Sequence, residues 1–438
     1  MSLIRYEHKN ALTDVVGEMH GITSKEIDQL LASAAKCTAT LRKHKSGGPL
    51  DFTDLPDDSK TIDAIKAFAQ RHNGAFDDLI VVGMGGSSLA TLALYKALKP
   101  KERSERGPRL RLIDNTDPMT VASAMMGLDP ARTLAVVISK SGTTLETIAG
   151  LALVEEWFKN NHLPLDRHII IVTGPKGGFL NDYVSGNKLE RFVIPEGVVG
   201  RYSALSPVGL LPAALLGFNI DRLLSGAREL RDESLSAQPI DNKPLVAAAV
   251  SAQLLQKRGK VISVFMPYTL RLQALGEWYV QLWAESLGKS RDIDKKPVRI
   301  GQTPLVAVGA SAQHSQLQLF LDGPNDKLFT LVEMEHFSHH VPLPDSFDYA
   351  AAGLDFLKGH DFGEVINAQL RATEQALREQ SRPNTRIVLS DLSTEVLGAM
   401  MMFYQLQTTY AAHFLHVDAF DQPAVERGKE ITRKSLGM

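Results

Sequence analysis

The chain has 438 residues, of which 44% are hydrophobic and 22% are charged, close to the average for soluble globular proteins. This composition argues against a disordered, fibrous or membrane protein, and the length predicts two domains. Its 48 Lys and Arg against 50 Asp and Glu give a net charge of −2, with no long block of one sign. The chain therefore has no strong electrostatic preference for nucleic acid or for an anionic membrane.

A single cysteine, Cys37, excludes an intramolecular disulfide and a thiol-based metal site. We interpret it as a small filler residue on a helix. The first ten residues carry charges throughout and lack the apolar core of a signal peptide. No apolar run approaches the roughly 20 residues that span a bilayer, so we expect a soluble, cytoplasmic protein.

In the first half of the chain, helical patterns fill residues 10–45 and 60–72, and short apolar runs follow. The predicted strands are Leu79–Val82, Arg109–Ile113, Thr133–Ile138 and His168–Val172. Helix-length segments such as Leu89–Leu98 and Thr144–Phe158 separate these runs. This alternation predicts a parallel sheet covered on both faces, whose ligands bind at the carboxyl ends of the strands.

A second set of elements follows the helix-rich stretch from Gly209 to Gly226. Its predicted strands are Val261–Phe265, Leu305–Val308, Leu328–Val332 and Thr385–Leu389. Its predicted helices are Leu245–Lys257, Leu270–Leu287, Gly363–Gln380 and Glu395–Leu415. We therefore predict an α/β protein with two domains, residues 1–225 and residues 226–438, each a mostly parallel sheet flanked by helices.

The first motif is VVGMGGSSLA, residues 81–90, where a buried strand runs into glycines and then a helix. Gly86 permits close backbone approach, and Ser87 adds a hydroxyl beside helix N–H groups that can bind an anion. The alternatives are a tight turn without a ligand, a phosphosugar site, and a dinucleotide site. The last is disfavoured because Ser88 stands where the third glycine of that fingerprint belongs.

The second motif is ISKSGTTLET, residues 138–147, which also joins a strand to a helix. Its candidate ligand-binding residues are Ser139, Lys140, Ser141, Gly142, Thr143 and Thr144. A phosphate dianion needs several converging donors, which hydroxyls and free helix N–H groups supply without a metal. The alternative is an ordinary helix N-cap, but four hydroxyls directly after a buried strand favour an anion site.

Two further candidates carry charge. Arg201 lies on a predicted loop before an apolar helix and suits an anionic intermediate, the alternative being a surface arginine. Glu285 lies at the edge of the apolar arc of an aromatic-rich helix, with Gln281 one turn earlier. Partial desolvation of such a carboxylate suits a general base or acid near neutral pH. The alternative is a glutamate paired with a basic residue in the core.

The last candidates are His314 and Lys429. His314 falls in the first turn of a predicted helix that starts near Ser311, where the positive helix end favours a neutral imidazole; the alternative is a surface histidine. Lys429 follows Glu426 by three residues, a spacing typical of a solvated ion pair. The other paired histidines lack a third ligand at metal spacing, so we predict no metal site.

Together these motifs resemble the glucose-6-phosphate isomerase family, in its shorter bacterial-type form. The segments GMGGSS, SKSGTTLET, VGRYSALS, AESLGK, AQHSQLQ and FDQPAVERGK occur in that family's order and spacing, over residues 83–429. Six ordered motifs are far more specific than any one. The resemblance implies two sugar-isomerase (SIS) type α/β domains, a homodimer, and no metal or nucleotide cofactor.

The resemblance also implies roles for the candidate residues. Gly86, Ser87 and the 139–144 loop would bind the sugar phosphate, and Gln281 would contact the substrate. Glu285 would move the proton between C1 and C2 through a cis-enediol, and Arg201 would stabilise the enediolate. His314, reaching the site from the partner subunit, and Lys429 would assist ring opening. The reaction is the reversible isomerisation of glucose 6-phosphate and fructose 6-phosphate, in glycolysis and gluconeogenesis.

The sequence departs from the family pattern at Val199, at Ala424 and at Ser311–Ala312. These positions neighbour the named residues and bear on selectivity among hexose phosphates rather than on the reaction class. The alternative functions are an amino-sugar or mannose phosphate isomerase, a non-catalytic phosphosugar-binding regulator and a nicotinamide dehydrogenase. A regulator has no need of Glu285 and normally carries a basic DNA-binding segment, and none is visible.

Overall fold

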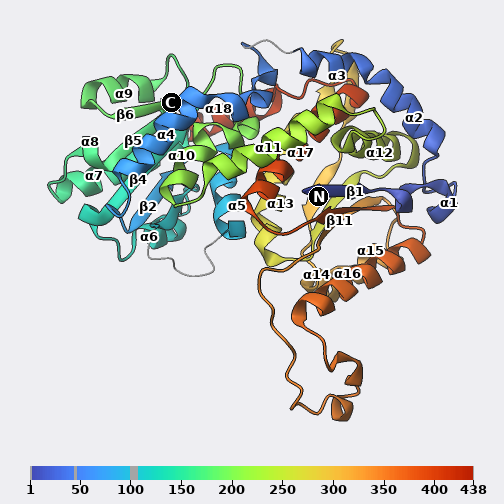
Figure 1. Cartoon of the computed structure of the whole chain (residues 1–438). Helices are drawn as coiled ribbons and strands as arrows, with labels where there is room; N and C mark the ends of the chain where they lie inside the picture. Colours follow the sequence, from blue (N-terminus) through green and yellow to red (C-terminus); the bar gives the residue numbers. More distant parts are fainter. Residues whose placement is uncertain (1, 44–46, 99–106, 438) are drawn as a thin grey trace.

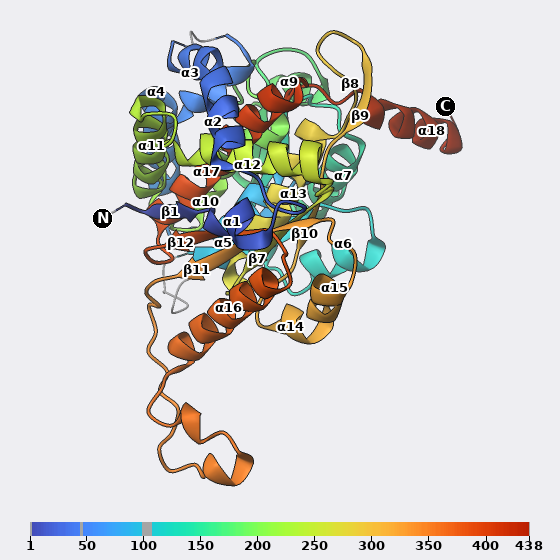
Figure 2. The ribbon, with the colours of Figure 1, turned by 90° about the vertical axis from the view of Figure 1, so that its right-hand side faces the viewer.

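The computed structural model describes residues 2–43, 47–98 and 107–437. Two lobes, each built around a five-stranded sheet, lie side by side, and an arm formed by residues 336–361 extends from the second lobe (Figures 1 and 2). The predicted α/β fold class is confirmed. Residues 44 and 45, at the end of the first predicted helical segment, lie outside the described residues.

The first sheet has the strand order β3-β2-β4-β5-β6, and all its pairs are parallel. Its strands are β2 (Asp78–Val82), β3 (Arg109–Ile113), β4 (Thr133–Ser139), β5 (Ile169–Thr173) and β6 (Glu190–Val193). Alternate residues of these strands face two separate cores: Ile80 and Val137 belong to one, Leu79 and Val136 to the other. Every residue of β2, β4 and β5 is buried, and burial on both faces explains their apolar runs, whereas β3 lies at the edge of the sheet and is mostly half-buried.

The helices of this lobe include the predicted Leu89–Leu98 and the segment predicted as Thr144–Phe158. They are α4 (Ser59–Arg71), α5 (Leu89–Leu98), α6 (Pro118–Met125), α7 (Leu145–Asn160), α8 (Leu165–His168) and α9 (Phe179–Asn187). Figure 1 shows α7 and α8 on the outer side of the sheet and α10 (Pro207–Leu215) toward the second lobe. The sheet is therefore covered on both faces, as the sequence predicts.

The second sheet has the order β1-β12-β11-β7-β10, in which only β1 runs antiparallel to its neighbour. Its strands are β1 (Ile4–Glu7), β7 (Ile262–Pro267), β10 (Thr303–Val306), β11 (Lys327–Met334) and β12 (Asn384–Leu389). Strand β1 was not predicted. Its place also differs from the predicted division, which assigns residues 1–225 to the first domain. Ile4 pairs with Leu389, so the first strand belongs to the second sheet and not to the sheet of residues 78–193. The boundary near residue 225 stays a prediction.

The remaining helices connect and cover the lobes. They are α1 (Thr13–Val16), α2 (Ser24–Ser33), α3 (Ala35–Arg42), α11 (Ile220–Ser236), α12 (Lys243–Arg258), α13 (Gln273–Leu287), α14 (Ser311–Ser315), α15 (Leu317–Asp322), α16 (Phe362–Glu379), α17 (Thr394–Leu415) and α18 (Glu426–Ser435). Helix α17 is apolar on nearly every side and joins α11, α12 and α13 in one core that also includes residues of both sheets. This core fixes the two lobes to each other.

Short elements complete the fold. A hairpin of β8 (Lys289–Arg291) and β9 (Pro297–Ile300) follows α13, and 3-10 turns include η4 (Gly85–Ser87), η6 (Gly200–Leu205) and η10 (Pro423–Val425). Cys37 lies on α3, and burial raises the pKa of its thiol to about 11, consistent with an unreactive filler. Among the helices described, none is long and apolar enough to cross a bilayer.

Candidate active site

The glycine turn after β2 is the first part of the candidate site. Strand β2 ends at Val82, and Gly85 then adopts a φ of +56° at the start of η4. A Cβ placed on Gly86 would lie 2.4 Å from the carbonyl oxygen of Gly200, so the two backbones touch. A Cβ on Gly85 would lie 2.9 Å from the amide nitrogen of Gln281. The glycines therefore admit η6 and the side chain of Gln281 to this edge of the sheet.

The hydroxyl loop of residues 139–144 lies at the same edge. Because β2 and β4 are parallel neighbours, this loop and the glycine turn both follow the carboxyl ends of their strands. Ser139 Oγ lies 2.8 Å from Thr144 Oγ1 and 3.4 Å from Ser141 Oγ. Thr144 is the N-cap residue of α7, yet its side chain makes no capping hydrogen bond to the helix. The hydroxyls thus bond to one another rather than to the helix backbone, which leaves the N–H groups at the start of α7 for an anion.

Gly142 and Lys140, in the same loop, each make a hydrogen bond that fixes the loop. Gly142 is buried with a φ of +68° and donates its N–H to Ser139 Oγ. Lys140 donates to the carbonyl oxygen of Glu196 at 2.9 Å, and burial lowers the pKa of its ammonium group. Lys140 therefore connects the loop to the segment that precedes η6.

Arg201 is buried, not displayed on a surface loop, and its guanidinium joins segments that are remote in the sequence. It is 2% exposed and lies in η6. Its Nε donates to Ser286 Oγ at 2.8 Å, its Nη1 to Gln422 Oε1 at 2.9 Å, and its Nη2 to the carbonyl oxygens of Ala419 and Asp421. A buried guanidinium held by this many acceptors is a fixed positive charge.

Glu285 faces this charge. Its Oε1 lies 3.6 Å from Arg201 Nη1, and its side chain is 25% exposed. Gln281, one turn earlier on α13, donates its amide N–H to Glu285 Oε2 at 3.2 Å. The amide oxygen of Gln281 is buried and has no hydrogen-bond partner among the described residues, so it can accept a hydrogen bond from a ligand hydroxyl. The structure thus brings together Gly86, Arg201, Gln281 and Glu285, which were predicted as separate candidates.

The segment of residues 419–422 completes this cluster, and the sequence motifs did not single out its contribution. Gln422 holds Arg201 through its side chain, and Ala419 and Asp421 do so through their carbonyl oxygens. Ser286 and Lys289 of the AESLGK motif also belong here, because Lys289 Nζ bonds the carbonyl oxygen of Glu285 at 3.1 Å. The motifs FDQP and AESLGK were recognised, but a motif does not say which of its side chains meet.

His314 and Lys429 do not join the cluster within one chain. Helix α14 starts at Ser311, as predicted, but it is only five residues long, and His314 is its fourth residue and is exposed. Lys429 lies on α18, a helix that buries no side chain and extends away from the body (Figure 2). Its Nζ pairs with Glu426 Oε1 at 2.7 Å, the ion pair that the three-residue spacing predicts.

One group among the described residues has side-chain atoms close enough to share a metal ion. Atoms of Asp292, Asp294 and His416 lie within 4.8 Å of one another. His416 Nε2 is 3.1 Å from Asp294 Oδ2, and Lys296 Nζ is 3.7 Å from the same oxygen. Asp294 thus has a histidine and a lysine as partners, and Asp292 Oδ1 accepts a hydrogen bond from the backbone N–H of Lys296 at 2.8 Å, at the turn of the β8–β9 hairpin.

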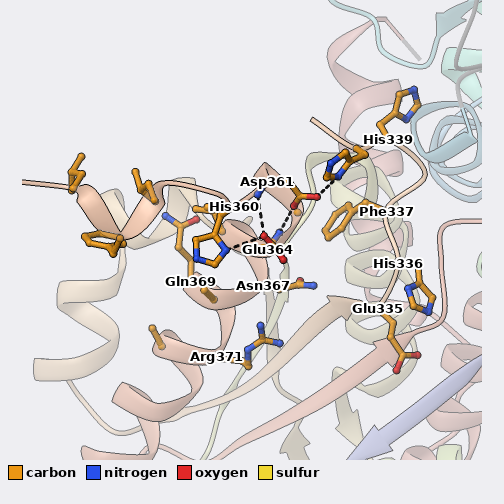
Figure 3. Close-up of a pocket in the computed structure, with 18 residues that line it drawn as sticks. Glu335, His336, Phe337, His339, His360, Asp361, Glu364, Asn367, Gln369 and Arg371 are labelled. Atoms are coloured by element: carbon orange, nitrogen blue, oxygen red, sulfur yellow. Dashed lines mark hydrogen bonds and ion pairs between the residues drawn. The ribbon is translucent and has the colours of Figure 1, made fainter. Parts of the chain in front are cut away.

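A separate cavity of about 1060 Å³ lies where the arm meets α16 (Figure 3). His360 Nδ1 lies 2.9 Å from Glu364 Oε2, and His340 Nδ1 lies 2.5 Å from Asp361 Oδ2. The side chains of Asp361 and Glu364 also form a reciprocal capping box at the start of α16. These polar groups are paired with one another and hold the base of the arm. None of the residues predicted for the site lines this cavity.

Comparison with known sequences assigns the chain to a family. The family described as "Phosphoglucose isomerase" matches residues 59–436. A protein of Carboxydothermus hydrogenoformans named "Glucose-6-phosphate isomerase" is 37% identical to the chain over 420 residues, which cover 94% of this chain and 90% of that protein. The family match includes every segment of the candidate site.

Two solved structures share the fold. A protein of Thermus thermophilus, described as a hypothetical protein, superposes with a TM-score of 0.87 at 34% identity and covers 99% of this chain and 100% of that chain. A glucose-6-phosphate isomerase of Chlamydia trachomatis superposes with a TM-score of 0.86 at 21% identity and covers 100% and 89% of the two chains. The predicted sugar-isomerase type of α/β fold is thereby confirmed.

Proposed function

The chain belongs to the phosphoglucose isomerase family, and we propose that it interconverts glucose 6-phosphate and fructose 6-phosphate through proton transfer by Glu285. Members of this family are aldose–ketose isomerases, and so is this chain. The pathways that use this reaction are glycolysis and gluconeogenesis, which we propose as its role, in the cytoplasm. A mannose or amino-sugar phosphate is the alternative substrate class.

The phosphate end of the substrate binds at the carboxyl edge of the first sheet in this proposal. Ser139, Ser141, Thr143 and Thr144 offer hydroxyls there, and Gly86 and Ser87 offer the backbone of a tight turn. This assignment is supported by the N-cap of α7, where the side chain of Thr144 makes no capping hydrogen bond. Holding the non-reacting phosphate orients the reacting carbons at the other end of the sugar.

Proton transfer takes place at Glu285. In the open-chain aldose the carboxylate removes the proton from C2, the C1 carbonyl oxygen becomes an oxyanion, and the cis-enediol forms after that oxygen gains a proton. The same carboxyl group then returns its proton to C1, while the C2 hydroxyl loses its proton and becomes the ketone. Arg201, at 3.6 Å from the carboxylate, stabilises the negative charge on the oxygens, and Gln281 accepts a hydrogen bond from a hydroxyl.

Ring opening needs a second acid and base, which we assign to His314 and Lys429. A proton must leave the C1 hydroxyl while another reaches the ring oxygen. His314 is exposed on α14 and outside the cluster of its own chain. We propose that it reaches the cluster of a second copy in a homodimer. Lys429 follows Gln422 on the same segment and is assigned the other proton transfer.

The observation that carries the proposal is the position of the Glu285 carboxylate between a buried guanidinium and an amide whose oxygen has no partner among the described residues. The test is conversion of fructose 6-phosphate to glucose 6-phosphate by the purified protein and by Glu285→Gln. We expect kcat to fall by about 10²- to 10⁴-fold, because the amide cannot take a proton. The matched control is Glu277→Gln, two turns earlier on the same helix, with activity like the wild type.

A wild-type protein that binds the sugar phosphate without converting it would overturn the proposed activity. A folded Glu285→Gln variant with wild-type kcat would leave the activity in place and remove the assigned base. Mannose 6-phosphate and glucosamine 6-phosphate in the same assay distinguish the alternative substrate class.

A further inference from the structure

Lys289 is a buried lysine directly after the helix that carries Glu285. It is the first residue of β8, two residues beyond the end of α13, and its side chain is 6% exposed. Lysine is almost never buried unless its ammonium group is paired and hydrogen-bonded. The partners of this ammonium group therefore explain why it is there.

Three oxygen atoms surround the ammonium group of Lys289, and they belong to two residues, Glu285 and Asp421, on separate segments. Its Nζ donates to the carbonyl oxygen of Glu285 at 3.1 Å and to the carbonyl oxygen of Asp421 at 2.5 Å. It also forms an ion pair with Asp421 Oδ1 at 2.8 Å. Asp421 Oδ1 makes no hydrogen bond among the described residues, so this last contact is electrostatic, and the hydrogen bonds of the ammonium group go to the two carbonyl oxygens. Lys289 thus joins the last turn of α13 to the segment of residues 419–422.

The same carbonyl oxygen of Asp421 also accepts from Arg201. Arg201 Nη2 lies 3.1 Å from it, and Arg201 Nη1 bonds the side chain of the next residue, Gln422, at 2.9 Å. Two buried cations from different parts of the fold therefore share one acceptor. Any shift of residues 419–422 changes the position of Arg201 relative to the Glu285 carboxylate.

We propose that Lys289 is a positioning residue of the isomerase reaction, which fixes the 419–422 segment against the end of α13 and so sets the distance between Arg201 and Glu285. This proposal rests on the proposed function. Displacement of a catalytic group by about 1 Å can cost about 10²-fold in rate. Lys289 touches neither the proton nor the oxygens that react, and it acts through Asp421, Arg201 and the helix end.

A lysine with a purely structural role would have a different signature. Its loss would lower the midpoint of unfolding and leave kcat of the folded protein unchanged. A positioning role predicts a fall in kcat well below the unfolding temperature with little change in KM, because the phosphate binds at the remote 139–144 loop. The charge-conserving change to arginine would restore part of kcat.

The experiment compares the wild type with Lys289→Met, Lys289→Arg and Asp421→Asn by steady-state kinetics with fructose 6-phosphate and by urea unfolding. We expect Lys289→Met to lower kcat by about 10- to 100-fold with KM within about threefold, and Lys289→Arg to recover part of that loss. Asp421→Asn keeps the shared carbonyl oxygen but loses the ion pair, and we expect kcat to fall by about three- to tenfold. Lys296→Met, an exposed change in the same hairpin, is the control and keeps wild-type kinetics.

A folded Lys289→Met protein with kcat within about twofold of the wild type would overturn the proposal while leaving the isomerase activity intact. If Lys289→Met does not fold, the kcat of Asp421→Asn tests the proposal instead. The side chain of Asp421 is 46% exposed and tolerates an amide. Wild-type kcat in Asp421→Asn would then overturn the positioning role. An inactive wild type would instead mean that the proposed function fails.

Discussion

Backbone contact at Gly86 connects the phosphate side of the candidate site to its catalytic side. A Cβ at this residue would lie 2.4 Å from the carbonyl oxygen of Gly200 and 3.1 Å from the N atom of Arg201. Both neighbours are backbone atoms of η6, which cannot move without carrying Arg201 along. Even the smallest side chain at position 86 would therefore disturb a residue that faces Glu285.

Gly86→Ala is expected to damage both stability and catalysis. Overpacking of this kind costs about 1–3 kcal/mol, and the shift of η6 should lower kcat/KM by about tenfold or more. Urea unfolding and steady-state kinetics measure the two effects. The control is Gly186→Ala in α9, where a Cβ meets nothing within 4 Å and an alanine should stabilise the helix by about 0.5–1 kcal/mol. If Gly86→Ala and Gly186→Ala had the same stability and the same kcat/KM, the close contact between Gly86 and η6 would be refuted.

The sequence predicted Gly86, Arg201, Gln281 and Glu285 of the cluster, but not the contacts that join them to residues 419–422. Strand ends followed by glycines or hydroxyls are local signals, and they located Gly86 and the 139–144 loop at one edge of the first sheet. The contacts of Arg201 with Gln422 and the carbonyl oxygens of residues 419 and 421 join segments more than 200 residues apart. No local pattern encodes such a contact, and for this reason Arg201 was expected on a loop and found buried.

At the scale of elements, two glycines permit helices α11 and α17 to cross closely. A Cβ on Gly226 would lie 1.9 Å from the carbonyl oxygen of Glu395, and a Cβ on Gly398 would lie 1.8 Å from that of Leu223. Each helix thus presents a glycine to the backbone of the other. Helix α17 also packs against α13, which carries Glu285. The close crossing of α11 and α17 therefore helps to fix the position of α13.

Gly226→Ala should separate these two helices. We expect the free energy of unfolding to fall by about 3 kcal/mol, since the methyl group meets backbone rather than a flexible side chain. Ser225→Ala, an exposed change one residue away on α11, should stay within about 0.5 kcal/mol of the wild type. Urea denaturation of both variants compares them directly. A loss in Gly226→Ala no larger than that in Ser225→Ala would show that the helices can move apart without cost.

Element prediction succeeded where a strand is buried on both faces. Thr133–Ser139 is buried at every residue and differs from the predicted strand by one residue, because a continuous apolar run marks it. Arg109–Ile113 also has the predicted bounds, although it is an edge strand in which arginine alternates with leucine and only Ile113 is buried. Strand β1 was missed because it is four residues long and alternates between buried and exposed positions. Its pairing with β12, at the other end of the chain, places it in the second sheet.

At the scale of the whole molecule, we propose that a second copy of the chain completes the site. The cluster around Glu285 contains the carboxylate that we propose as the base and a fixed cation, but His314 is exposed on α14 and lies outside it. Exposed apolar side chains occur on α15, the helix after α14, and on the arm, among them Leu319, Phe347 and Phe356.

Mixed dimers test whether His314 acts across an interface. Glu285→Gln and His314→Ala chains, each inactive as a homodimer, are produced together with different affinity tags, and the hybrid is isolated by two successive purifications. If His314 serves the partner's site, one site of the hybrid receives both wild-type residues and the other receives neither. The hybrid should then show about half the activity of the wild-type dimer. If His314 serves its own chain, each site carries one defect, and the hybrid stays as inactive as its parents.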